Sequence, residues 1–287
     1  DQSESVVLLR TSKATDRGVT AHEVFHVLQN SVWVRAGKFL QEATAVWAQQ
    51  RAFPGEGFST DLDPTAPLDC FDDDVCANAG YQSWSFFEFL AERDGPHIVR
   101  EIFDQAKALQ INRNGSTLDP VAALAAISAA LAPHHRMLGP TFRDFALANI
   151  NGDYSLGELR DAGLGYLTDT KPLRTGASTG TLARRVVTIN HLATNYLPVA
   201  AGGGKKHGRC RKATLRLDIA GPKSDAYAGY ALGDRKSKTI AIANGRGHLT
   251  LHSWSTCGGP ELILALVNSA TSRDDLTFIT TATLTVP

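Results

Sequence analysis

The sequence predicts an α+β protein of two domains, a mainly helical domain over residues 1–170 followed by an antiparallel β-sandwich over residues 171–287. In the first part, apolar residues recur every three or four positions, which is the period of a helix that buries one face. From residue 182 onward they occur in short runs separated by turn-forming residues, a pattern typical of strands. The first part carries 13 Lys and Arg against 23 Asp and Glu, and the second carries 16 against 6. Net charges of −10 and +10 indicate two units with separate surfaces.

The chain begins with a polar stretch and not with the apolar core of a signal peptide. No apolar run is long enough to span a bilayer, so we expect no membrane span. Such a start is typical of a processed terminus. Residues 5–10 are then predicted to form a short buried strand.

A predicted helix over residues 19–30 carries His22, Glu23 and His26. Histidines four residues apart lie one turn above each other on the same face, so both rings can reach a single ion. Glu23 lies about 100° around the helix, where it can contact a water on that ion without ligating it. The remaining positions are apolar nearly all round, which predicts a helix inside a core. The alternative is a pair of core histidines satisfied by hydrogen bonds.

The next predicted helix, residues 37–48, contains Glu42 among small and apolar neighbours. A buried carboxylate with no cation nearby favours a metal. Three protein ligands would leave a fourth position open for water, as catalytic zinc requires. The extended metzincin pattern needs Gly and His where this chain has Gln29 and Val32, so that subclass is excluded.

These two motifs resemble those of the gluzincins, zinc metallopeptidases in which a Glu on a following antiparallel helix supplies the third ligand. The likeness is strongest to secreted bacterial metallopeptidases with the pattern HE-hydrophobic-x-H-x-x-Q followed by W-x-x-E-G-x-A-x-W. The resemblance implies that His22, His26 and Glu42 bind Zn²⁺ and that Glu23 is the general base. It covers residues 19 to 150.

The chain departs from this family at several positions. Leu40 and Ala43 are conservative changes, whereas Val46 stands where thermolysin-like members carry an Asp that orients one of the histidines. The orienting partner must therefore come from elsewhere in the chain. Gluzincins also present a sheet of several strands before the zinc helix. With one predicted strand, this chain resembles a catalytic domain whose front portion was removed or lies outside the sequence.

An acidic irregular segment follows over residues 51–76. Carboxylates in a loop can bind Ca²⁺, although the spacing is not that of an EF-hand, and a solvated acidic loop is the alternative. The acidic residues are Asp61, Asp63, Asp69, Asp72, Asp73 and Asp74.

Residues 79–95 are predicted to form one aromatic, amphipathic helix. The family resemblance implies that Tyr81, at its start, helps to stabilise the oxyanion, and a Tyr packed at a helix start is the alternative. Further helices are predicted over residues 96–109, 119–131 and 140–150, the second with Asp119 as its cap and Pro120 as its first residue. We expect His97 to be exposed and His134 and His135 to lie in a loop.

The second part begins with a predicted linker at residues 171–180. A basic cluster at residues 205–212 is able to contact an anionic polymer, and solvated hairpin charge is the alternative. The sandwich is predicted from about seven β-rich runs, at residues 182–189, 213–219, 226–232, 239–243, 248–254, 261–267 and 276–286.

The four cysteines lie two in each predicted domain. An even count split in this way favours a secreted protein with the disulfides Cys70–Cys76 and Cys210–Cys257, and free thiols in a cytosolic protein are the alternative.

Together these patterns predict a secreted zinc-dependent endopeptidase that cleaves protein or peptide substrates. The β-rich domain is predicted to be an accessory module that docks on the acidic domain or tethers the enzyme to an anionic cell-surface polymer. No nucleic-acid partner is expected. Two alternatives remain, a zinc hydrolase of non-peptide amides or esters and an inactive binding protein on a peptidase scaffold.

Overall fold

A computed structural model describes most of the chain. The described residues are 15–32, 35–57, 63–70, 79–111, 117–156, 171–176, 180–201, 210–233, 236–257 and 259–287. The predicted strand at 5–10, Cys76, and residues 205–209 of the basic cluster lie outside them. No helix in the described part is long and apolar enough to cross a membrane.

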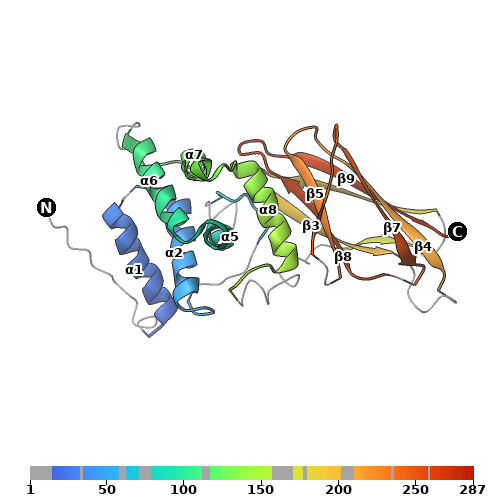
Figure 1. Cartoon of the computed structure of the whole chain (residues 1–287), viewed down its shortest axis with the longest axis horizontal. Coiled ribbons are helices and arrows are strands. Elements are labelled where there is room, and N and C mark those ends of the chain that lie inside the picture. The colour runs from blue at the N-terminus through green and yellow to red at the C-terminus, as the bar shows by residue number, and fades with distance from the viewer. Residues whose placement is uncertain are drawn as a thin grey trace. The chain divides into compact units, whose positions relative to one another are not determined.

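The protein is α+β and divides into two compact units (Figure 1). The first contains residues 1–141 and 154–161, and the second contains residues 142–153 and 162–287. The division differs from the predicted boundary at residue 170, because most of helix α8 (Leu138–Asn151) belongs with the strands.

The first unit is built from helices. They are α1 (Arg17–Val32), α2 (Lys38–Ala52), α4 (Ala79–Gln82), α5 (Trp84–Asp94), α6 (His97–Ile111) and α7 (Pro120–Leu131), followed by the short 3₁₀ helix η2 (Ala132–His134). α1 packs along α2, and α2 also contacts α5. As predicted, Asp119 caps α7, its carboxylate accepting a hydrogen bond from the backbone N–H of Ala122 at 2.7 Å.

Two predictions for this unit are corrected. The helix expected over residues 79–95 is interrupted at Ser83, whose hydroxyl donates to the carbonyl of Leu68 at 2.6 Å. Helix α1 is not surrounded by core, because Val24 and Leu28 are 47% and 56% exposed. These two residues lie four apart on one face, so α1 buries a single face, the one that carries His22 and Gln29.

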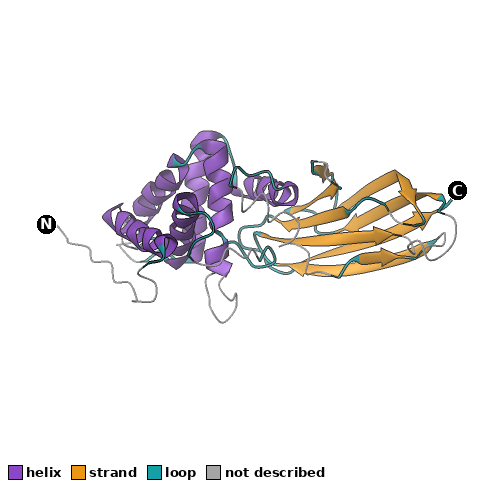
Figure 2. Cartoon of the chain, turned by 90° about the horizontal axis from the view of Figure 1, so that it is seen from below, coloured by secondary structure: helices purple, strands orange, loops and turns teal. Residues whose placement is uncertain are grey.

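The described residues of the second unit form nine strands in two sheets, in the order β1-β3-β8-β5-β6 and β2-β9-β4-β7. Figure 2 shows them in orange. Their bounds are β1 (Leu173–Thr175), β2 (Thr181–Ile189), β3 (Ala193–Ala201), β4 (Lys212–Ala220), β5 (Ala226–Leu232), β6 (Lys238–Ile240), β7 (Arg246–Ser255), β8 (Leu262–Asn268) and β9 (Leu276–Thr285).

The seven predicted strands correspond to β2 and β4 to β9, whereas β1 and β3 were not predicted. β1 lies inside the predicted linker and pairs with β3 in parallel, so the sheets are antiparallel except at this edge. The predicted Cys210–Cys257 disulfide is present, with a Cα–Cα distance of 5.3 Å. It joins the segments that flank the paired strands β4 and β7.

Helix α8 packs on the face of the five-stranded sheet that is opposite the sandwich core. Leu197 points into the core, so its neighbour Tyr196 points the other way, and the Tyr196 hydroxyl donates to the carbonyl of Ala146 at 2.7 Å. Tyr196 pairs with Ala265, which pairs with Gly229 on the next strand. A side chain at Gly229 would collide with Leu147, so the glycine allows the helix to approach closely.

Candidate metal centre

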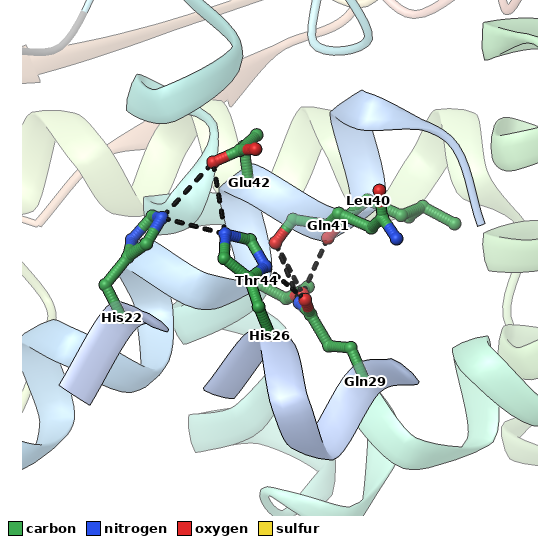
Figure 3. A network of polar contacts seen from close by, with 7 residues as sticks. All are labelled: His22, His26, Gln29, Leu40, Gln41, Glu42 and Thr44. Atoms are coloured by element: carbon green, nitrogen blue, oxygen red, sulfur yellow. Dashed lines mark hydrogen bonds and ion pairs between the residues drawn. The ribbon is translucent and has the colours of Figure 1, made fainter. Parts of the chain in front are cut away.

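The structure brings together the three residues that the sequence proposed as metal ligands (Figure 3). His22 and His26 lie one turn apart on α1, and Glu42 lies on α2. The distance between the two Nε2 atoms is 3.1 Å. Oε2 of Glu42 is 3.2 Å from Nε2 of His22 and 3.5 Å from Nε2 of His26. Three donor atoms therefore form a nearly equilateral triangle.

This triangle is partly accessible. The side chain of His22 is 2% exposed, whereas those of His26 and Glu42 are 23% and 22% exposed. The group is thus buried on the side of His22 and partly exposed to solvent on the side of the other two.

The electrostatics of the triangle favour a cation. Burial acts to raise the pKa of Glu42, but its contacts with His22 and His26 outweigh burial and lower the pKa to about 2. Burial acts to lower the pKa of His26, and the contacts with Glu42 and Gln29 raise it above the usual 6.5. A carboxylate that stays ionised beside two imidazoles has the charge and the donor atoms of a transition-metal site.

The spacing of the donor atoms fits zinc. Zinc binds His nitrogen and carboxylate oxygen at about 2.0–2.1 Å, so two donors of a tetrahedral site lie about 3.3 Å apart. The three observed separations, 3.1, 3.2 and 3.5 Å, fall on either side of that value. Among the described residues this is the one group of three ligand side chains with this arrangement.

Glu23 and Tyr81 lie next to the triangle and are not part of it. Glu23 follows His22 on α1, is half-buried, and acts electrostatically on His26. The ring of Tyr81, from α4, is 6.4 Å from the ring of His22 and tilted by 33° to it. Neither residue belongs to the group of three ligand side chains.

Gln29 is the residue of this site to which the sequence assigned no role. It is 3% exposed, and its Oε1 atom lies 2.6 Å from Nδ1 of His26. The sequence left open which residue orients the histidines, and Gln29 occupies that position for His26. Two signals were available, its spacing three residues after His26 on the same helix face and its place as the Gln of the pattern HE-hydrophobic-x-H-x-x-Q.

The other predicted site remains a prediction. Of the six acidic residues proposed for Ca²⁺, four lie outside the described residues. Asp63 accepts hydrogen bonds from the backbone and hydroxyl of Thr65, at 2.9 and 2.6 Å. Asp69 is buried.

A second histidine group lies on α6 and η2. His97 is exposed, as predicted, with its Nε2 atom 3.6 Å from Glu101. His134, expected in a loop, is the last residue of the 3₁₀ helix η2, and its Nε2 atom lies 2.9 Å from Glu101. His135 follows it in a left-handed conformation with φ 57°.

No protein-family model and no curated protein matches the chain. Two of the solved structures that match it have low TM-scores. One is the pre-peptidase C-terminal domain of a collagenase from Bacillus anthracis, with 7% identity, a TM-score of 0.25, and coverage of 42% of this chain and all of that one. The other is FLHE, with 10% identity, a TM-score of 0.24, and coverage of 38% and 100%. Similarity this low shows neither the fold nor the function of this chain.

Proposed function

We propose that the chain is a secreted zinc-dependent endopeptidase. The observation that carries this proposal is the triangle of His22, His26 and Glu42, whose donor atoms have the chemistry and spacing of a zinc site. Three protein ligands and partial exposure leave room for a water and a substrate, which distinguishes catalytic from structural zinc sites. The resemblance of these motifs to gluzincins supports the same assignment.

In this proposal each residue has a separate role. His22, His26 and Glu42 hold the ion, which when bound supplies a Lewis acid for a carbonyl and lowers the pKa of a coordinated water to about 7. Glu23 takes the proton from the attacking water and delivers it to the leaving amine. Tyr81 donates a hydrogen bond to the carbonyl oxygen as negative charge develops on it.

The β-rich unit has an accessory role in this proposal. The Cys210–Cys257 disulfide supports an oxidising, extracellular location. The excess of 16 basic over 6 acidic residues after position 170 supports attraction to an anionic cell-surface polymer or to the acidic part of the same chain.

The mechanism is tested by hydrolysis of a mixed peptide library and of simple esters and amides. We expect the wild-type protein with zinc to cleave peptides. Glu23→Gln should keep zinc and lose about 10²- to 10⁴-fold in rate, the usual contribution of a general base. Glu261→Gln, an exposed Glu in the other unit, is the matched control and should retain full activity.

The other outcomes separate the competing functions. Hydrolysis of esters or amides but not peptides would assign a non-peptide hydrolase. Zinc binding without hydrolysis of any substrate would assign a binding protein. Full activity of Glu23→Gln would remove the proposed mechanism.

A further inference from the structure

Gln29 connects one proposed ligand to the helix that carries another (Figure 3). Its Oε1 atom lies 2.6 Å from Nδ1 of His26. Its Nε2 atom lies 2.7 Å from the carbonyl oxygen of Gln41 and 2.7 Å from Oγ1 of Thr44. The hydroxyl of Thr44 donates in turn to the carbonyl of Leu40 at 2.6 Å.

These contacts determine which ring nitrogen of His26 carries a proton. The carbonyl of Gln41 can only accept a hydrogen bond, so the NH₂ group of Gln29 must face it. The amide oxygen of Gln29 then faces His26, and because that oxygen can only accept, Nδ1 of His26 must be the donor. In the neutral ring the lone pair is therefore on Nε2, the atom that faces His22 and Glu42.

The same amide holds the second helix in place. Gln41 immediately precedes Glu42, and Thr44 follows it by two residues. Gln29 therefore forms hydrogen bonds to α2 on both sides of the proposed ligand. Thr44 is fully buried and Gln29 nearly so, and buried hydrogen bonds of this kind are costly to break.

We infer that Gln29 is a positioning residue, which fixes the Nδ1–H form of His26 and sets the distance between α1 and the Glu42 segment of α2. This inference rests on the proposed metal site and adds to it a residue that touches neither ion nor substrate. Outer partners of histidine ligands typically change metal affinity by about 10- to 100-fold.

The test is the affinity of the full chain for Zn²⁺, measured by competition with a chelator, together with the urea midpoint of each metal-free variant. Gln29→Leu removes all three contacts and should weaken zinc binding about 10- to 100-fold. Thr44→Val removes one buried partner but leaves Gln29 bonded to His26 and Gln41, so its loss of affinity should be several-fold smaller. Asn30→Leu, at the exposed neighbouring amide, is the matched control and should keep wild-type affinity.

A merely structural role predicts a different pattern. In that case affinity would follow the urea midpoint, and Thr44→Val and Gln29→Leu would lose affinity in proportion to stability. If Gln29→Leu does not fold, Gln29→Asn keeps the amide but is one methylene too short to reach both His26 and Gln41, and it should also lose at least about tenfold in affinity.

The results separate this inference from the proposed function. Wild-type zinc affinity in a folded Gln29→Leu or Gln29→Asn protein would overturn the inference and leave the metal site standing. Absence of zinc binding by the wild-type protein would overturn both.

Discussion

The two units of the chain bury polar side chains in different ways. In the helical unit, two buried side chains bond to other side chains, Gln29 to the buried Thr44 and Glu88 to the more exposed Arg51. In the β unit, the corresponding example is Asn268, which donates to the backbone carbonyls of Ile189 and Arg273 and so fixes a turn. The bonds of Gln29 end on a proposed ligand, His26, whereas those of Asn268 end on backbone carbonyls.

The largest expected effect belongs to the β unit. Replacing Cys210 and Cys257 by Ser opens a crosslink that spans 47 residues, which should lower the free energy of unfolding by about 4 kcal/mol through the entropy of the unfolded chain. Urea unfolding of the oxidised and substituted proteins measures this loss. Zinc affinity should not change, and a parallel loss of zinc would contradict the separation of scaffold from site.

A second prediction concerns the contacts of Glu88 in the helical unit. Glu88 is fully buried, with Arg51 at 2.7 and 3.0 Å and the indole N–H of Trp47 at 2.9 Å. Arg51→Met leaves this carboxylate without its cation in a site where burial already raises its pKa, and should cost about 3 kcal/mol.

The control for Arg51→Met is Arg100→Met, which breaks the exposed pair of Arg100 with Asp104 and should cost under about 0.5 kcal/mol. Equal losses in the two variants, measured by urea unfolding, would show that the burial of Glu88 does not increase the contribution of its ion pair to the free energy of unfolding.

The β unit offers a comparable test in which no charge is involved. Gly229→Val places a side chain against Leu147 of α8 and should cost about 2 kcal/mol by overpacking. Adding Leu147→Ala should recover part of this loss in urea unfolding. If Leu147→Ala made the Gly229→Val protein still less stable, that result would contradict the close contact of α8 with the sheet at Gly229.

The smallest effect is a pH dependence in the helical unit. Glu101 holds the pKa of His134 above 6.5, with Asp94 contributing and with Arg136 and His97 as neighbouring basic groups. Because the folded value is the higher one, this stabilisation is fully present below about pH 6.5 and is lost as pH rises through the raised value.

We therefore expect His134→Asn to lose less than about 1 kcal/mol near pH 6 and almost nothing near pH 9. Urea unfolding of both proteins at the two pH values measures the difference. A larger loss at the higher pH would contradict the assigned direction of the shift.

The sequence predicted the parts of the fold that follow a strong local period. The histidine pair and Glu42 were identified because a helical period places them on buried faces, and β2 and β4 to β9 because alternation with turn residues is explicit. β3 was missed because Pro198 interrupts it. The structure accommodates this proline because β1 pairs with residues 199–201 of β3 and not with Pro198. The backbone N–H that proline lacks therefore removes no hydrogen bond to β1.

Other features depend on contacts distant in the sequence. The amphipathic period of α8 identifies a helix but not its partner, which is set by the small residues Gly229 and Ala265. The exposure of Val24 and Leu28 likewise follows from which elements pack against α1. The role of Gln29 depends on a carbonyl and a hydroxyl of another helix.

The zinc content of the purified chain, after equilibration with Zn²⁺ and removal of free metal, tests directly whether His22, His26 and Glu42 form a metal centre. We expect one zinc per chain, lost in His22→Ala and in Glu42→Ala and retained in Glu23→Gln. A protein that binds no zinc, or that keeps it equally in His22→Ala and Glu42→Ala, would contradict the assignment of these residues as a metal centre.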